Sequence, residues 1–226
     1  MPNVMTNPSF FPVRVNEYVA AMQYSADVNY NGATRVSFGT PAAANATLVA
    51  NGSSIAVATS FDLTSIAQFP ETYGRNAVVV ASGAATSIVV LNGWDYLGQP
   101  ISEQITLAGT TPVVGSKAFK TFRSLTVQTV TAATTVNVGS GAKFGLPFKA
   151  IRCQFETANG VLAAAGTLQA ASLVDPATAT TTDPRGMYTP TTTPNGTTAI
   201  DATFDFVNDV NAAGRGGLMG LPQFAS

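Results

Sequence analysis

The sequence is poor in charge and cysteine and has no histidine. Charged residues make up 10% of its 226 residues, against about 25% in an ordinary soluble domain. Without imidazole, the usual serine and cysteine triads and Cys/His zinc clusters are excluded, and a single cysteine cannot form an internal disulfide. The chain has 11 Lys and Arg residues and 12 Asp and Glu residues, so it has no excess of positive charge. We therefore expect no electrostatic binding to the phosphates of nucleic acids.

Small and β-branched residues are abundant where an ordinary domain has charged residues. The chain is 46% hydrophobic, with a mean hydropathy of +0.21, and it is rich in threonine, which favours strands over helix interiors. A surface with so few charges protects a free monomer poorly against self-association. We therefore expect neighbouring molecules to cover much of this surface.

The sequence also contains no segment typical of a secretory signal or a transmembrane helix. The first residues include no basic segment followed by an apolar run, so no secretory signal is predicted. No apolar stretch approaches the 18 or so residues that a transmembrane helix needs. No membrane partner is expected.

Both ends of the chain are predicted to be irregular. Residues 1–50 are expected to form an extended arm, since prolines fall at positions 2, 8, 12 and 41. Residues 211–226 are expected to form a flexible, glycine-rich tail. Apolar side chains in these two segments are the predicted partner-contact residues: Phe10, Phe11, Tyr18, Leu218, Met219 and Leu221.

The residues between these ends, 51–210, are predicted to form a β-rich core. Residues 77–81 and 87–91 are expected to pair as a hairpin, and residues 95–100 to form a turn. Residues 101–107 alternate strictly, although Glu103 interrupts their apolar face and predicts an edge or an interface. The alternation changes face near Arg123, which predicts a bulge.

The second half of this core continues the pattern. Residues 151–155 and 161–171 are expected to pair through a turn at Asn159 and Gly160, and residues 200–207 alternate with Ile200 inward. Residues 175–198, rich in Thr and Pro, are predicted to be a long surface loop. Short strands separated by turns favour an all-β fold, an antiparallel β-sandwich or barrel of the jelly-roll kind.

Several motifs suggest chemistry only weakly. Asp201, Asp205 and Asp209 could serve a glycosidase or bind calcium, but the spacing of a calcium loop is absent and a solvated strand face explains them. The Gly-rich run at 139–143 lacks phosphate-loop spacing and predicts a turn. Trp94 could stack on a sugar or anchor a core. No catalytic, cofactor-binding or metal-binding residue is assigned, and no enzyme is predicted.

Three segments resemble a repeated pattern in other proteins. Residues 88–107 contain an apolar strand, a G-x-D-x-x-G-x-P turn and an E-x-I-T-L strand, and residues 117–127 contain a K-A-F-K-T strand. Residues 177–190 contain D-x-R-G-x-Y-x-P. This combination resembles small, β-rich virion structural proteins of tailed bacteriophages, and it covers about a third of the chain.

The resemblance implies a capsid cement or decoration protein, assembled into the virion in the host cytoplasm. Its implied partners are the major capsid protein and copies of itself, as a homo-oligomer. The alternatives are a tail, baseplate or head-completion component, or a carbohydrate-binding β-sandwich that uses Trp94 with Asp201 and Asp205. The motifs are turns and strands, so no functional residue is implied by them.

Overall fold

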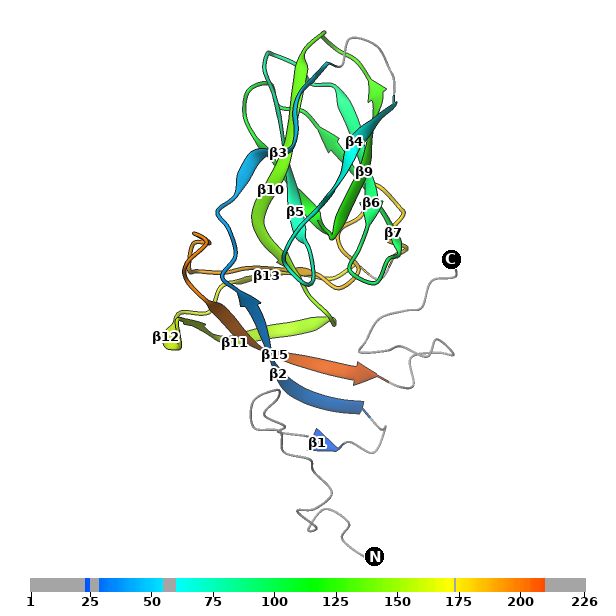
Figure 1. Cartoon of the computed structure of the whole chain (residues 1–226). Helices are drawn as coiled ribbons and strands as arrows, with labels where there is room; N and C mark the ends of the chain where they lie inside the picture. The colour runs from blue at the N-terminus through cyan, green and yellow to red at the C-terminus, as the bar shows by residue number, and fades with distance from the viewer. Residues whose placement is uncertain (1–22, 25–28, 55–59, 173, 210–226) are drawn as a thin grey trace, which may run out of the picture.

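A computed structural model describes residues 23–24, 29–54, 60–172 and 174–209 of the chain. These residues form an all-β fold in which every strand pair is antiparallel, as the alternating sequence pattern predicts (Figure 1). No helix occurs in the described residues, and accordingly none there is long and apolar enough to cross a bilayer. The strands make three sheets.

The six-stranded and four-stranded sheets face each other as a β-sandwich. The six-stranded sheet contains β3 (Asn45–Ser54), β5 (Arg75–Ala81), β8 (Val113–Phe119), β10 (Thr135–Gly145), β13 (Thr167–Gln169) and β14 (Met187–Thr189). The four-stranded sheet contains β4 (Ser60–Gln68), β6 (Ile88–Trp94), β7 (Pro100–Thr106) and β9 (Thr121–Thr129). The first core lies between them, with residues such as Val79, Leu91, Ile105, Phe122 and Val138.

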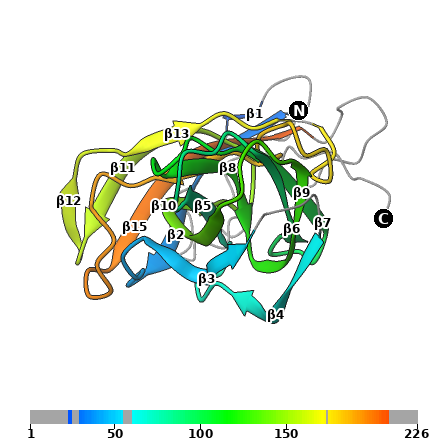
Figure 2. The same cartoon turned by 90° about the horizontal axis from the view of Figure 1, so that it is seen from above.

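The five-stranded sheet is assembled from the first two strands of the chain and from three strands of its second half. It contains β1 (Gln23–Tyr24), β2 (Asn29–Gly39), β11 (Ala150–Ala158), β12 (Val161–Ala163) and β15 (Ile200–Asp209). A second core, which includes Val36, Phe144, Tyr188 and Phe204, joins strands of this sheet to β10 and β14. Seen from above, β12 lies on the opposite side of the molecule from β6, β7 and β9 (Figure 2).

Local sequence signals predicted several features correctly. The turn after β6 is held by Asp95, whose Oδ1 accepts hydrogen bonds from the amides of Leu97 and Gln99. The pairing of β6 with β9 shifts register at Arg123, which is the predicted bulge. Asn159 and Gly160, both with positive φ (50° and 79°), form the predicted two-residue turn between β11 and β12.

Other predictions about strands were wrong. Residues 77–81 and 87–91 do not pair as a hairpin, because β5 lies in the six-stranded sheet and β6 in the four-stranded sheet. The glycine-rich run at 139–143 is not a turn but part of β10. A Cβ on Gly139 would lie 1.8 Å from the carbonyl oxygen of Asn45, so this glycine allows β3 to approach β10.

The irregular arm expected over residues 1–50 differs from the structure in its second half. Residues 29–39 and 45–54 are the long strands β2 and β3, and β2 pairs with β15 along almost its whole length. The side chains of Val36 and Phe38 are buried in the second core. The sequence pattern did not reveal this strand, because its apolar residues are few and its partner strand lies about 170 residues away in the chain.

Candidate functional site

The residues predicted to contact partners belong to the two ends of the chain. Phe10, Phe11 and Tyr18 of the arm and Leu218, Met219 and Leu221 of the tail all lie outside the described residues. The surface available for interaction is therefore considered from the β core.

The acidic residues of β15 are engaged by arginines. Arg35 Nη2 lies 2.6 Å from Asp201 Oδ2, and Arg152 Nη2 lies 2.6 Å from Asp205 Oδ2. Gln154 also donates a hydrogen bond to Asp205. No group of metal-binding side chains occurs in the part of the chain that the structure describes, which leaves out the side chain of Asp209.

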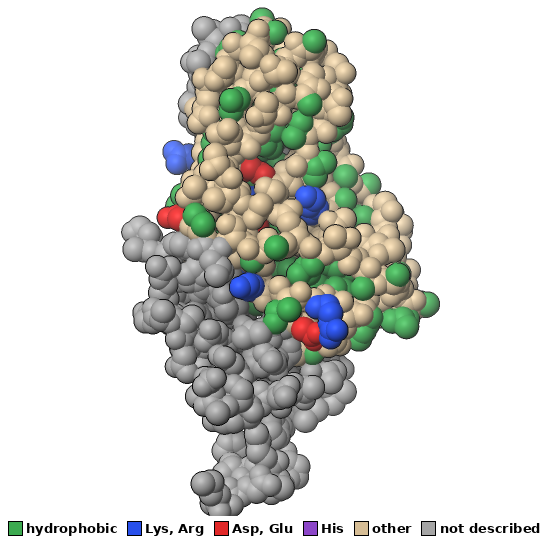
Figure 3. Space-filling model, turned by 180° about the vertical axis from the view of Figure 1, so that it is seen from behind, with side chains coloured by type: hydrophobic (Ala, Val, Ile, Leu, Met, Phe, Trp, Pro, Cys, Tyr) green, Lys and Arg blue, Asp and Glu red, His purple; other side chains and the backbone are tan. Residues whose placement is uncertain are grey.

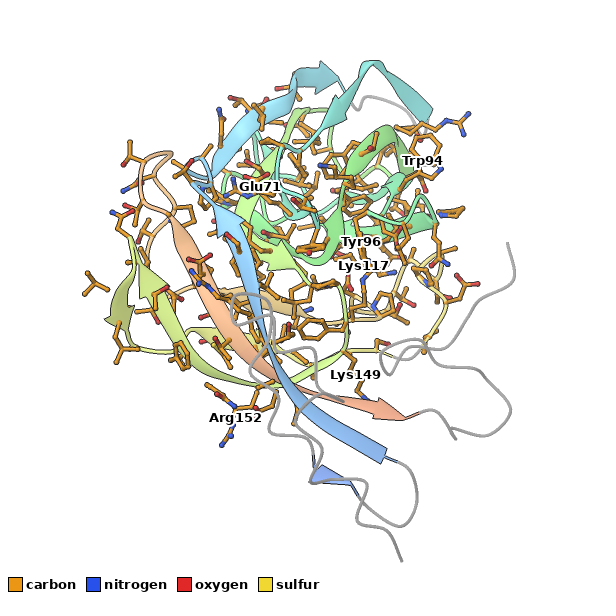
Figure 4. The ribbon with its side chains drawn as sticks, turned by 60° about the horizontal axis from the view of Figure 1, so that its bottom comes forward. Glu71, Trp94, Tyr96, Lys117, Lys149 and Arg152 are labelled. Atoms are coloured by element: carbon orange, nitrogen blue, oxygen red, sulfur yellow. The ribbon has the colours of Figure 1, made fainter. Side chains whose placement is uncertain are left out.

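Trp94 lies far from these acids. It belongs to the four-stranded sheet, where the guanidinium of Arg123 lies 5.8 Å from the centre of its ring. Arg152, which binds Asp205, points away from the molecule on the other side (Figure 4). Trp94, Asp201 and Asp205 therefore do not form one carbohydrate site.

The motifs of the resemblance meet inside the molecule. Arg185, of the D-x-R-G-x-Y segment, places Nη1 2.8 Å from Oδ2 of Asp95, of the G-x-D-x-x-G turn. Both side chains are almost fully buried, and the Arg185 guanidinium also lies 4.7 Å from the ring centre of Tyr96. Burial alone would lower the pKa of Arg185, but the charges of Asp183 and Asp95 outweigh it and raise the pKa.

Asp183 attaches the same segment to β8. Its amide donates to the carbonyl of Ser116, and its Oδ2 accepts from the amide of Ala118 at 2.9 Å. Asp183 is fully buried, and burial raises the pKa of its carboxyl. The segment predicted as a surface loop, 175–198, is therefore partly interior, and it includes the short strand β14.

The preceding residues of the loop cover the edge of β7. The amide of Ser102 donates to the carbonyl of Pro176, and the amide of Gln104 donates to the carbonyl of Ala179. Since β7 is an edge strand of the four-stranded sheet and β8 an edge strand of the six-stranded sheet, residues 176–185 close one side of the sandwich. We call this segment the edge loop.

Buried Lys117 binds the edge loop through hydrogen bonds to its backbone. Its Nζ donates to three backbone carbonyls, those of Ser102, Pro176 and Thr178, at 2.7–2.8 Å. Burial lowers the pKa of Lys117 to about 8, against the opposing effect of Glu103 and Asp183. Figure 4 shows that Lys117 and Tyr96 lie within the body of the molecule.

Glu103 lies on an edge strand of its sheet, as the sequence predicted, although its side chain is buried against β8. It lies buried on β7, and its Oε1 accepts hydrogen bonds from the amide and the hydroxyl of Ser116 on β8. A Cβ on Gly115 would lie 2.6 Å from Glu103 Oε2, so the absent side chain at position 115 makes room for the carboxyl. Burial raises the pKa of Glu103.

Two further buried groups hold the second core. Tyr188 donates its hydroxyl to Glu156 Oε2 at 2.6 Å and accepts from the amide of Gly166 at 2.8 Å. Arg75 forms an ion pair with Glu71 and donates to the carbonyl of Ala42 at 2.8 Å. The Tyr188 contacts connect β14 to β11, and the Arg75 contacts connect β5 to residues that precede it in the chain.

Much of the scarce charge is thus internal. Of the charged residues whose side chains the structure describes, nine are buried: Glu71, Arg75, Asp95, Glu103, Lys117, Glu156, Asp183, Arg185 and Asp201. The others are Arg35, Lys120, Arg123, Lys143, Lys149, Arg152, Asp175 and Asp205. Figure 3 accordingly shows a face with few charged side chains.

Large apolar side chains are exposed instead, and half of them lie at the β11–β12 end of the five-stranded sheet. The exposed set is Leu48, Leu97, Val114, Ile151, Phe155, Val161, Leu162 and Val174. Val161 and Leu162, 70% and 72% exposed, belong to β12. Sequence analysis missed this surface, although Val161 and Leu162 directly follow the correctly predicted turn.

The exposed part of the β core offers apolar and hydrogen-bonding contacts. Burial raises the pKa of the Cys153 thiol, which is half-buried beside the Tyr188 hydroxyl and is therefore a weak nucleophile. No family model matches the chain, and no curated protein or solved structure matches it significantly.

Proposed function

We propose that this chain is a structural protein of a tailed-bacteriophage virion that binds and stabilises the capsid surface as a cement or decoration protein. Its partners are the major capsid protein and further copies of itself, in particles assembled in the host cytoplasm. The chain acts through protein–protein contacts and has no enzymatic role.

The observation that carries this proposal is the distribution of charge. The few charges serve largely to hold the edge loop and the second core, while large apolar side chains are exposed. Depletion of charge and exposure of large apolar side chains are typical of surfaces that a partner covers. The resemblance of three segments to virion proteins supports the same conclusion.

A tail, baseplate or head-completion component is the competing assignment, since it needs the same kind of surface. Quantitative gel densitometry of purified virions distinguishes the two. A copy number comparable to that of the major capsid protein supports the capsid surface, whereas about a dozen copies or fewer indicate the tail or its junction. Absence from the virion would contradict both.

The role of the N-terminal residues has a separate test. Deletion of residues 1–20 is expected to leave the core folded, because the described strands begin at Gln23, and to abolish attachment to capsids. Substitution of Thr110, an exposed polar residue of the loop that precedes β8, by Ala is the control and should leave attachment unchanged. Attachment of the truncated chain at full occupancy would contradict the role of the arm.

A further inference from the structure

The strand β12 ends the five-stranded sheet and has one neighbour among the described strands. It pairs with β11 so that Ala158 faces Val161 and Thr157 faces Leu162. In a two-residue hairpin, the residues that flank the turn form the hydrogen-bonded pair. The backbone groups of Val161 therefore point to β11, and the N–H and C=O of Leu162 point away from it.

This edge differs from the edges of β7 and β8. The edge loop covers β7 through Pro176 and Ala179, and it covers β8 through Asp183. In contrast, no described segment makes a backbone hydrogen bond to the outer side of Val161–Ala163. The fold thus closes two edges and leaves the edge of β12 open.

This edge is protected against pairing by its short length but not by its side chains. Natural edge strands discourage another strand from adding by being very short, or by carrying charged residues, prolines or bulges, and β12 has three residues. Residues 157–166 contain no charged residue and no proline. Because Thr157 faces Leu162, Phe155 lies diagonally across from Leu162 on the same face of the sheet. Both side chains are exposed.

We propose that β12 is a homotypic docking edge, at which two copies of the chain pair antiparallel with a twofold axis at Leu162. Leu162 of each copy donates its N–H to, and accepts at its C=O from, Leu162 of the partner subunit. The two five-stranded sheets then form one continuous sheet, and the Leu162 and Phe155 side chains of both copies make one apolar strip.

A second copy fits this edge because the edge is complementary to itself. An isologous contact requires that the same patch satisfy its own donors and acceptors, and the outward N–H and C=O of Leu162 do so. The neighbouring charges do not oppose the contact, since Arg152 and Asp205 neutralise each other within each copy.

The contact is expected to be weak in dilute solution. Stable interfaces bury at least about 1,200 Å², whereas β12 has three residues. Pairing should therefore depend on high protein concentration or on a surface that holds many copies. Because the pairing is weak, the experiment traps the dimer of the free protein with a covalent bond. The result of this experiment does not depend on any role of the protein in a virion.

The experiment places a cysteine on the twofold axis. In a Cys153→Ser background, Leu162→Cys brings two thiols together, because Cα atoms in a hydrogen-bonded antiparallel pair are about 5.5 Å apart, within the range for disulfides. The matched control is Leu97→Cys in the same background, since Leu97 is also an exposed leucine. Both variants are oxidised with a glutathione redox couple and examined by non-reducing gel electrophoresis.

Leu162→Cys is expected to yield a disulfide-linked dimer, at least about tenfold more than Leu97→Cys at equal concentration. Equal or lower yield from Leu162→Cys overturns the proposal, and a partner other than a second copy would give that result. Sedimentation velocity provides a second test. Leu162→Lys should abolish association at high concentration, because like charges then meet on the twofold axis. Leu97→Lys should leave this association unchanged. Association that persists in Leu162→Lys also overturns the proposal.

Discussion

Arg185 Nη1 lies 2.8 Å from Asp95 Oδ2, across 90 residues of sequence and within the interior of the protein. Asp95 also holds the β6–β7 turn through the amides of Leu97 and Gln99. The ion pair therefore connects a local turn to the edge loop. Two motifs that the sequence presents separately act as one structural unit.

Arg185→Met is expected to destabilise the protein by about 3–5 kcal/mol, because it leaves Asp95 and Asp183 buried without their cation. The measurement is the free energy of unfolding from denaturant titration. Arg123→Met is the control, since Arg123 is exposed and its guanidinium lies over the face of Trp94; it should cost about 1 kcal/mol or less. Equal effects of the two variants would contradict a structural role for the buried pair.

Lys117 should make stability depend on pH above neutrality. Its folded pKa is lowered to about 8 from 10.5 by burial, so between these values only the unfolded chain keeps the proton. The free energy of unfolding contributed by Lys117 therefore rises with pH from 8 to 10.5, by at most about 3 kcal/mol.

The comparison of wild type with Lys117→Met isolates this effect. Burial raises the pKa of Tyr96 and of Cys153, and their titration opposes the trend, but both groups are present in the variant as well. The difference in unfolding free energy, wild type minus variant, should increase across this range. A difference that stays constant would show that Lys117 titrates normally in the folded state.

Tyr188→Phe tests the hydrogen bonds of the second core. The variant leaves the amide of Gly166 and the carboxylate of Glu156 without the hydroxyl that bridges them, and the expected cost is about 1–3 kcal/mol. Tyr73→Phe is the control, because it preserves the edge-on contact of its ring with Tyr96. Thermal unfolding of the two variants provides the comparison, and an unchanged midpoint for Tyr188→Phe would contradict the bridge.

Phe38→Ala distinguishes a core strand from a free arm. Phe38 packs on Phe144 and Tyr188 with ring centres 5.0 and 5.8 Å apart, so its removal should cost about 3–5 kcal/mol. Leu48→Ala, at an exposed position of β3, should change stability by about 0.5 kcal/mol or less. If residues 29–39 were part of an irregular arm, Phe38→Ala would be as mild as Leu48→Ala in denaturant titration.

Local features followed from the sequence because neighbouring residues determine them. The alternation of residues 101–107, the turn held by Asp95 and the bulge at Arg123 needed no knowledge of the rest of the fold. Long-range pairing was not predictable in this way. The strands β5 and β6 follow one another but enter different sheets, and β2 finds its partner in β15.

The candidate site was less predictable than the fold. The six residues assigned to partner contacts lie outside the described part of the chain, and the docking edge at Leu162 was not identified. An apolar pair such as Val161 and Leu162 has the same local pattern whether the strand is central or at an edge. Only the order of the strands shows that β12 ends its sheet.

The sequence by itself determined that the protein is all-β and has little charge, since alternation and composition are local properties. Tertiary structure decided where the few charges lie: Lys117, Asp183 and Arg185 are inside, where each reaches partners that are distant in the chain. It also decided which edges are closed. The physical reason is that a buried charge or an open edge is defined by the groups around it, and folding alone brings those groups together.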